Sequence, residues 1–233
     1  SVMAHANGDE AVRAAAGADI HLHSLLRYDV NIVNAIVNVV RERNITDLVL
    51  GMHRDRGTFG PVMLPEVLMG TASALGKTIP AVLAQSNVTT FVYRSRQPMA
   101  TVKRHLVVVP RKAELEAGFQ TWLLRIRHLA HDAGTQLRFL APAATIEHLR
   151  RNRRKPDIAD YTACEQGWDE LPALLGEVRP NDCVWLVMSR RDRLSYQPAM
   201  ARAAATLEEL LPQHSFVLVF PIQAGDTERL LSI

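Results

Sequence analysis

Apolar and polar residues follow two different rhythms in the first part of the chain. In ADIHLHSL, residues 18–25, apolar side chains return at every second position, which is typical of a strand. In NIVNAIVNVVRERN, residues 31–44, they return in the i, i+4 pattern of one helix face, with Asp29 or Asn31 as the cap and Asn44 as the end. The apolar run TDLVLGM, residues 46–52, then predicts a strand buried on both faces, as in a parallel sheet.

The alternation continues to the C-terminus. Residues 65–77 predict a helix that stops at Gly76, and residues 88–94 predict the next strand. After residue 104 the pattern predicts five strands, at residues 105–110, 135–142, 157–165, 182–189 and 214–221. Four helices are predicted between them, at residues 113–134, 144–154, 168–178 and 200–212. Strands that alternate with helices predict an α/β fold with a doubly wound, parallel five-stranded sheet and right-handed crossovers.

The two halves of the chain echo each other. In each half an aspartate, Asp47 or Asp182, opens the penultimate strand, and an arginine, Arg54 or Arg190, follows it. Two copies of one domain type explain this echo. The first half contains three predicted strands where a full copy needs five, so we interpret it as truncated. The expected domains are a truncated copy at 1–95, a linker at 96–104, a complete copy at 105–223 and a tail at 224–233.

Composition adds the broad class of protein. An apolar content of 48% and a charged content of 22% are typical of a soluble globular protein. No apolar run approaches the roughly eighteen residues that span a bilayer, and no secretory signal is visible. The two cysteines, Cys164 and Cys183, lie in separate predicted strands without metal-ligand spacing. We therefore expect two buried thiols in a reducing compartment.

Four stretches of the chain resemble a known family. They are RYDVNIVNAI, ITDLVLGMHR, QPMATVKRHLVVVPRKAELEAGF and SFVLVFP, and the run VVVPRKAELEAGF is the most specific. The second half resembles a universal stress protein domain. Together the stretches, from Arg27 through Gln223, resemble the tandem universal-stress-like region at the cytoplasmic C-terminus of bacterial sodium/proton antiporters. The resemblance implies a Rossmann-like, three-layer fold in each copy.

The resemblance also implies a function. The chain would be a non-catalytic regulatory domain that tunes monovalent cation/proton exchange, and its partner would be the transmembrane domain of the same antiporter. It would lie on the cytoplasmic side of the inner membrane. The alternative is a free-standing universal stress protein that binds ATP.

The glycine spacing of the family can be compared with this sequence to ask whether the chain binds a nucleotide. Universal stress domains that bind ATP carry Gly, two residues, Gly, nine residues, Gly, and then Ser or Thr, because glycines let the backbone approach phosphates. Here Gly51 stands at the strand end, but Arg54 replaces the second glycine, and eighteen residues separate Gly51 from Gly70 instead of twelve. A rearranged site for ATP or another adenine nucleotide would use seven residues: Gly51, His53, Arg54, Gly57, Gly60, Gly70 and Thr71.

The second copy lacks this pattern, since VMSRRDRLSYQ contains no glycine. Arg190, Arg191 and Ser195 remain candidates for an anion site, with a solvated basic loop as the alternative. Glu114 and Glu116 would point to different sides of a helix, and Ser195 lacks a recognisable His and Asp pair. His21 and His23 share a strand face without a further ligand. We predict no catalytic residues and no metal site.

Charge is distributed unevenly. Between Thr101 and Lys155 there are twelve Lys and Arg against four acidic residues, an excess of eight in a chain with a net charge of +3. Such a stretch is compatible with RNA or anionic lipid, but no aromatic-rich stacking platform accompanies it, and we expect no nucleic acid partner. A truncated first copy would expose apolar sheet surface. We therefore expect a homodimer, or mutual cover by the two copies.

Overall fold

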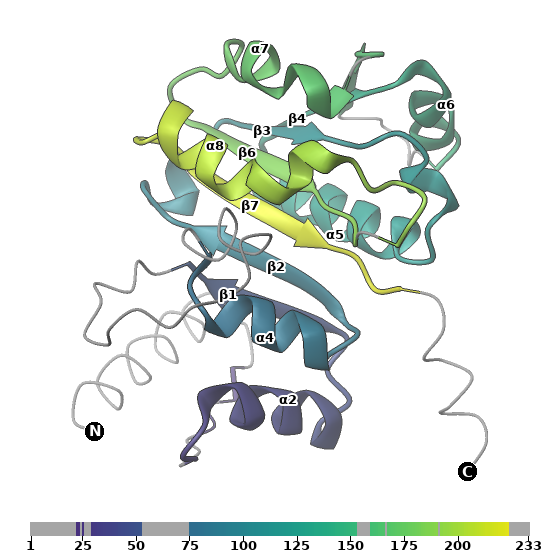
Figure 1. The fold of residues 1–233 in the computed structure, drawn as a ribbon. Coiled ribbons are helices and arrows are strands. Elements are labelled where there is room, and N and C mark those ends of the chain that lie inside the picture. Colours follow the sequence, from purple (N-terminus) through teal and green to yellow (C-terminus); the bar gives the residue numbers. More distant parts are fainter. Residues whose placement is uncertain are drawn as a thin grey trace.

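The fold is built on one mixed sheet that runs through both halves of the chain. The structure is a computed structural model and describes residues 22, 23, 25, 29–52, 75–152, 159–165, 167–190 and 192–223. Its strands are β1 (Asp47–Gly51), β2 (Thr89–Arg94), β3 (Arg104–Val108), β4 (Gln136–Ala141), β5 (Ala159–Ala163), β6 (Asp182–Val187) and β7 (Ser215–Phe220). They follow the order β1-β2-β7-β6-β3-β4-β5 (Figure 1).

The five-stranded sheet expected from the sequence is therefore part of a seven-stranded one. β5, β4, β3, β6 and β7 are parallel neighbours, and β1 is parallel to β2. β2 joins β7 in the antiparallel sense, with Val92 opposite Leu218. The expectation of five counted the strands of the second half alone, and β1 and β2 of the first half extend the same sheet through β7. The ladder with β2 satisfies the backbone groups that an edge strand would leave unpaired.

Helices cover both faces of this sheet. They are α2 (Ile32–Glu42), α4 (Thr78–Gln85), α5 (Phe119–Asp132), α6 (Ala143–Arg151), α7 (Leu171–Leu175) and α8 (Ala203–Leu210). Side chains of α5 and α6 pack on one face, which we call the α5 face. Side chains of α4, α7 and α8 pack on the other, the α8 face, and α2 packs against α4. In Figure 1, α8 lies in front of the sheet and α5 behind it.

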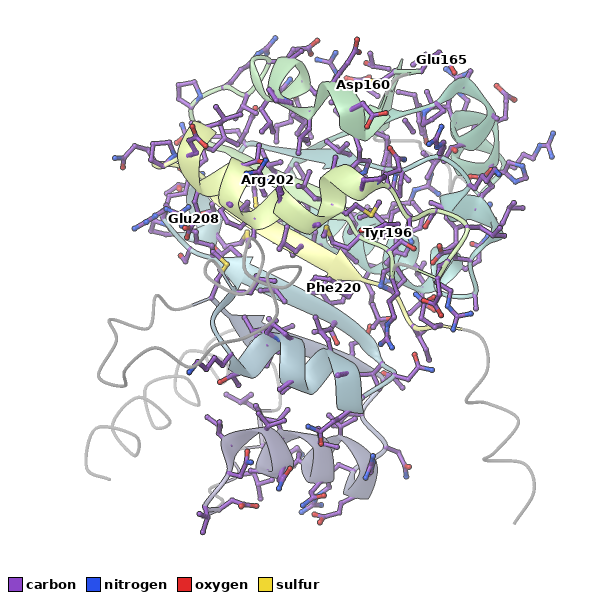
Figure 2. All side chains as sticks on the ribbon, viewed as in Figure 1. Asp160, Glu165, Tyr196, Arg202, Glu208 and Phe220 are labelled. Carbon is purple, nitrogen blue, oxygen red and sulfur yellow. The ribbon has the colours of Figure 1, made fainter. Side chains whose placement is uncertain are left out.

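Two apolar clusters hold these layers together. On the α8 face, Leu106, Val184 and Leu218 meet the helices, and Tyr196 and Phe220 extend the cluster toward the carboxyl end of β7 (Figure 2). On the α5 face, Trp122 and Phe139 are buried among the strands and helices. A sheet covered on both faces has uniformly apolar central strands. This explains why β3 and β6 read as unbroken apolar runs in the sequence.

The first half contains both confirmed and missed elements. α2 is confirmed, with the Asn31 side chain accepting hydrogen bonds from the amides of Val33 and Asn34. Asn44, at φ 49°, stands just beyond the end of the helix. The strand expected at 18–25 is not found at its three described residues, which have no regular structure, and its other residues lie outside the described part. Residues 65–74 of the expected helix also lie outside it.

Helix α4 was not predicted from the sequence. It occupies Thr78–Gln85 and carries Pro80 as its third residue. Proline is tolerated in the first turn because the amides there have no partner within the helix. Gly76 has a φ of 67°, which fits the predicted stop at that position. The chain therefore turns at Gly76 and starts a new helix, where the sequence suggested a connection to the next strand.

The second half follows the predicted order, with α5, α7 and α8 shorter than predicted. The long helix expected from residue 113 begins at Phe119, because residues 113–115 form the 3-10 turn η3. Short 3-10 turns also precede α7 and α8, namely η4 (Gly167–Glu170) and η5 (Pro198–Arg202). A further turn, η2 (Met99–Thr101), lies in the expected linker. The last residue of that linker, Arg104, is the first of β3 and is buried.

Candidate functional site

The residues expected to bind nucleotide fall mainly outside the described part of the chain. Gly51 is the exception and is the last residue of β1. The amide of the next residue, Met52, donates to the carbonyl of Tyr93 at 2.8 Å. His53, Arg54, Gly57, Gly60, Gly70 and Thr71 lie within 53–74, which the structure does not describe. The proposed loop therefore starts at the carboxyl end of a strand.

In the second half, the loops after β3 and β6 meet at the carboxyl ends of these two strands. These strands are parallel neighbours, yet α5 follows β3 on one face of the sheet and α8 follows β6 on the other. The connections after the two strands therefore leave in opposite directions. In open α/β sheets such a switch point is the usual ligand crevice. Here we call it the switch-point crevice and define it by Glu116, Ser189, Ser195 and Gln223.

Glu116 occupies this crevice. Its Oε1 accepts hydrogen bonds from the hydroxyl of Ser189 at 2.8 Å, from the amide of Ser195 at 3.1 Å and from the hydroxyl of Ser195. Its Oε2 accepts from the side-chain amide of Gln223 at 3.4 Å. The three donor residues are at least 93% buried. A carboxylate held by several uncharged donors fills the position where an external ligand would bind.

This arrangement bears on the anion site suggested from the sequence. Ser195 points its amide and its hydroxyl at Glu116. Arg190 donates to the carbonyl of Ser86 at 3.2 Å, which ties the loop after β6 to the end of α4. Arg191 lies outside the described residues. The structure therefore brings Ser195 into the crevice and directs Arg190 toward the first half of the chain.

Residues at and beside the switch-point crevice also connect the two halves of the chain. Gly118 packs so closely that a Cβ there would lie 2.6 Å from the Cβ of Pro221 and 2.7 Å from the carbonyl oxygen of Ile222. The backbone of Gln223 exchanges hydrogen bonds with the side chain of Asn87, at 2.9 and 3.1 Å. Gln223 thus contacts Glu116 through its side chain and the segment before β2 through its backbone.

We expect Gly118→Ala to destabilise the chain by about 1 to 3 kcal/mol, because the new methyl group must push the backbone after β7 away. Urea denaturation gives the free energy of unfolding. Gly176→Ala is the matched control, since Gly176 has a φ of −63° and its nearest constraint is a carbonyl oxygen at 3.1 Å. Equal losses in both variants would contradict the tight packing at Gly118.

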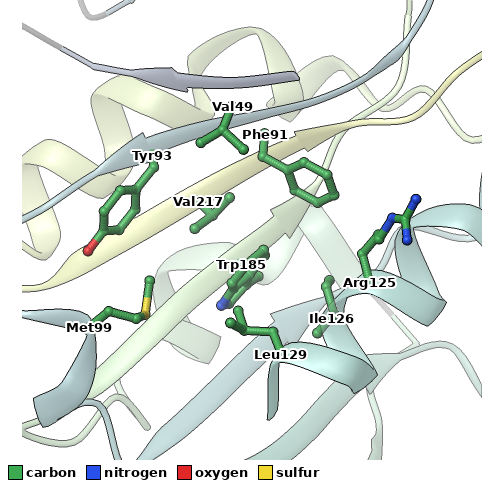
Figure 3. Close-up of a pocket in the computed structure, with 9 residues that line it drawn as sticks. All are labelled: Val49, Phe91, Tyr93, Met99, Arg125, Ile126, Leu129, Trp185 and Val217. Carbon is green, nitrogen blue, oxygen red and sulfur yellow. The ribbon is translucent and has the colours of Figure 1, made fainter. Parts of the chain in front are cut away.

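A second feature is an apolar groove on the α5 face. It has a volume of about 250 Å³ and lies between α5 and the strands β1, β2, β7 and β6 (Figure 3). Its lining residues are Val49, Phe91, Tyr93, Met99, Arg125, Ile126, Leu129, Trp185 and Val217. Phe91 meets Trp185 edge to face, with ring centroids 6.2 Å apart. Among the described residues, no helix covers this face beside β1 and β2, and Val49 is 68% exposed.

An ion pair marks the rim of the groove. Arg125 of α5 binds Asp47 of β1 through two hydrogen bonds, Nε to Oδ1 at 3.1 Å and Nη2 to Oδ2 at 2.7 Å. Burial acts to raise the pKa of Asp47, but the bonds from Arg125 and Thr46 outweigh it and hold the pKa below its ordinary value. The pair links the first strand of the chain to the main helix of the second half.

Behind the groove lies a buried histidine. The indole N–H of Trp185 donates to Nδ1 of His105 at 3.0 Å, which assigns the proton of a neutral imidazole to Nε2. His105 is 1% exposed, and burial lowers its pKa to about 4 although the charge of Asp182 acts in the opposite direction. A neutral ring at this position keeps the wall of the groove uncharged at neutral pH.

Four of the twelve basic residues in the stretch noted in the sequence are used inside the fold. Arg104 binds Asp182, Arg125 binds Asp47 and Arg138 binds Glu177. Arg127 is buried and donates to the carbonyls of Leu149 and Asn152. Four basic side chains of the stretch are therefore bound by partners within the chain.

Sequence reasoning missed Glu116 and the groove. Glu116 was considered only as half of an acid pair with Glu114, whose carboxylate instead accepts from Thr145 at 2.8 Å. Pro110 and Gly118, on either side of this segment, were the available signal for a bend in place of a helix. The groove joins residues far apart in sequence, and no local pattern marks it.

Comparisons with known proteins add information on the fold. No family model matches the chain, and no curated protein matches it. A universal stress protein from Archaeoglobus fulgidus DSM 4304 matches with a TM-score of 0.53 and 14% identity, over 94% of this chain and 75% of its own. The cytoplasmic domain of a prokaryotic cation chloride cotransporter matches with a TM-score of 0.54 and 10% identity, over 95% and 81%.

A third structure, a protein of unknown function from Pseudomonas aeruginosa PAO1, matches with a TM-score of 0.56 and 10% identity, over 93% of this chain and 78% of its own. At these identities the likeness concerns the fold. The chain has an α/β fold like that of universal stress proteins and of a transporter's cytoplasmic domain. None of the described helices has the length and apolar character needed to cross a membrane.

Proposed function

We propose that this chain is a non-catalytic regulatory domain of a bacterial sodium/proton antiporter, on the cytoplasmic side of the inner membrane. The observation that carries the proposal is the shared fold, over 95% of the chain, with the cytoplasmic domain of a cation chloride cotransporter. The antiporter-like stretches at 27–36, 45–54, 97–119 and 215–221 supply the choice of antiporter over other transporters.

Two tandem universal-stress-like copies fit this role. The antiparallel ladder between β2 and β7 supports the idea, because two copies related by a twofold axis would meet through their last strands in this way. Asp47 and Asp182 open the strands before them in the two halves. The boundaries at 95, 104 and 223 stay a prediction.

Regulation requires two arrangements of the domain with different effects on the transporter. Polar side-chain contacts between the halves would change in such a shift. They include the Arg125–Asp47 pair and the Asn87–Gln223 contact. A ligand or partner that favours one arrangement would bias the transporter's gate through the linker to the membrane part.

The proposal of a non-catalytic role is supported by how the candidate acids are used. Glu114 accepts from Thr145 of α6, and Glu116 accepts from Ser189 and Ser195. Both carboxylates are thus engaged in contacts that join elements of the fold, and they point to different partners.

An adenine nucleotide is the proposed ligand of the first half. The alternative function is a free-standing ATP-binding stress protein, and it requires the same ligand. The location of Gly51 at the carboxyl end of β1 supports a phosphate loop in the following residues. Calorimetric titration with ATP, ADP and AMP tests it, with Arg54→Ala as the variant. Saturable binding that this substitution weakens supports the site, and silence with all three nucleotides removes it.

The groove is the surface that we propose for contact with the transmembrane domain or with a second copy of the chain in a homodimer. Its apolar lining and the exposed Val49 support this use. No nucleic acid partner is proposed, because four arginines of the basic stretch are bound within the chain.

The first experiment determines which polypeptide contains this chain in its native cells. An antibody raised against the 233-residue chain should detect a membrane-bound polypeptide far larger than 25.9 kDa. Reconstituted in liposomes, that polypeptide should exchange sodium for protons with a pH response that changes when the chain is deleted. Detection of a free polypeptide of about this mass, or an unchanged pH response, would contradict the proposal.

A point variant sharpens the test. In the full-length polypeptide we expect Val49→Glu to shift the pH response of exchange, because it places a charge in the apolar groove. Val49 is 68% exposed, so the free energy of unfolding should change by less than about 0.5 kcal/mol. Leu194→Glu is the matched control, since Leu194 is 63% exposed and lies outside the groove. Identical transport in both variants would show that the groove is not the contact.

A further inference from the structure

The switch-point crevice has the donors of a ligand site, and they converge on one carboxylate. The hydroxyl groups of Ser189 and Ser195, the amide of Ser195 and the side-chain amide of Gln223 all point at Glu116. These donors come from the loops after β6 and β7, whereas Glu116 comes from the loop after β3. Three separate segments of the chain are therefore joined by one carboxylate.

The donors are buried, and the amide and hydroxyl of Ser195 bond to Glu116, whereas Gln223 also donates to the carbonyl of Pro221 at 3.0 Å and Ser189 to that of Arg190 at 3.5 Å. Ser195 is 1% exposed, Gln223 4% and Ser189 7%. Buried donors without an acceptor are unfavourable, so the crevice requires an acceptor at this point. The carboxylate of Glu116 itself belongs to a half-buried residue, so it reaches into the crevice from the side that faces solvent.

The chemistry of the donors favours a carboxylate over a phosphate. Within the described part of the chain, no arginine or lysine forms an ion pair with Glu116. Sites for polyphosphates usually supply cationic side chains or a glycine-rich backbone. Here the contacts come from two hydroxyls, one backbone amide and one side-chain amide. Such a set can stabilise a single negative charge spread over two oxygens.

We propose that the switch-point crevice is a carboxylate-binding site whose resident ligand is Glu116, so that a free carboxylate binds there only when the Glu116 side chain is absent or displaced. Glu116 then acts as an internal ligand that keeps the site closed. Its displacement would also release Gln223, whose backbone is bonded to Asn87 of the first half. The inference does not depend on the transporter proposal, because it concerns only contacts within this chain.

Chemical rescue tests this inference on the 233-residue chain. Glu116→Ala should lower the melting temperature, because the amide and hydroxyl of the buried Ser195 lose their acceptor and Ser189 and Gln223 each lose one of two. Sodium acetate, compared with sodium chloride at equal ionic strength, should then raise the melting temperature of this variant in a saturable way. The expected rise is about 5 to 10 °C at an acetate concentration of roughly 100 times Kd. Acetate should leave the unsubstituted chain within about 1 °C of its value in chloride, because its site is already filled.

Glu114→Ala is the matched control, since Glu114 stands two residues away and accepts from the single hydroxyl of Thr145. An equal acetate effect on all three proteins, or none on Glu116→Ala, would overturn the inference. A shift with phosphate or ATP but not with acetate would overturn the choice of a carboxylate. If Glu116→Ala does not fold in chloride, its refolding yield is compared in acetate and chloride. Recovery in acetate alone supports the site, and failure in both overturns it.

Discussion

Replacing Asp182 with alanine is expected to destabilise the chain by about 3 to 5 kcal/mol, because it leaves a buried guanidinium without its partner. Arg104 and Asp182 are 7% and 2% exposed and share two hydrogen bonds, at 3.1 and 2.5 Å. The carboxylate also accepts from the amide of Arg179 at 2.7 Å. The hydrogen bonds to Asp182 raise the pKa of Arg104 above its ordinary value. That ordinary value is itself far above neutral pH, so the arginine stays charged after its partner is removed. The free energy of unfolding in urea measures the loss.

The equivalent aspartate of the first half is the control. In the Arg125–Asp47 pair the arginine side chain is 48% exposed and the aspartate 21%. Exposed pairs of this kind contribute roughly 1 kcal/mol or less, so Asp47→Ala should have a much smaller effect. The double variant Arg104→Met/Asp182→Leu, which removes both charges, should recover much of the loss. Equal losses at Asp47 and Asp182 would contradict the argument from burial.

Acidification is expected to remove about 3 kcal/mol of stability through His105 alone. Its pKa is about 4 in the folded chain, against an ordinary value of 6.5. The folded state therefore binds a proton less readily than the unfolded state. The stabilisation from a neutral His105 is complete above about pH 6.5 and is lost as the pH falls toward 4. The difference of about 2.5 units between the two pKa values corresponds to a loss of about 3 kcal/mol in the free energy of unfolding.

Urea denaturation at pH 7 and pH 4 measures this effect against two variants. His105→Phe removes the titrating group, so the loss of stability between the two pH values should shrink by about 3 kcal/mol. His131→Gln, at a histidine that is 73% exposed, should leave the loss unchanged. A His105→Phe variant with the same loss as the original chain would show that other groups cause the acid sensitivity. Because His105 accepts from Trp185, the fluorescence of the tryptophans offers a second readout.

The aspartate that opens a strand in each half, Asp47 or Asp182, illustrates the limit of sequence reasoning. Both aspartates open a strand, as the sequence indicated. Their partners differ, however, since Asp182 binds Arg104 of β3 and Asp47 binds Arg125 of α5. The partner depends on which segment lies beside the strand in space. The shared pattern therefore marked two strand starts without giving their contacts.

The sequence by itself determined the order of strands and helices from residue 104 onward and the α/β class. Periodicity is a local property, and the unbroken apolar runs of β3 and β6 followed from burial on both sheet faces. The N-terminal cap and the end of α2 were also readable, because Asn31 and Asn44 act on neighbouring residues. Helix α4 was missed although it is local, and its Pro80 is compatible with a helix because it lies in the first turn.

Only the tertiary structure decided the features on which function depends. The ladder of β2 with β7, the groove beside Val49 and the closing of the switch-point crevice by Glu116 each join segments separated by many residues. Such contacts arise from the burial of surfaces and the pairing of donors across the whole fold, and no neighbouring residue signals them. The phosphate loop expected from Gly51 onward is local in sequence, but a site also needs its donors to converge in space.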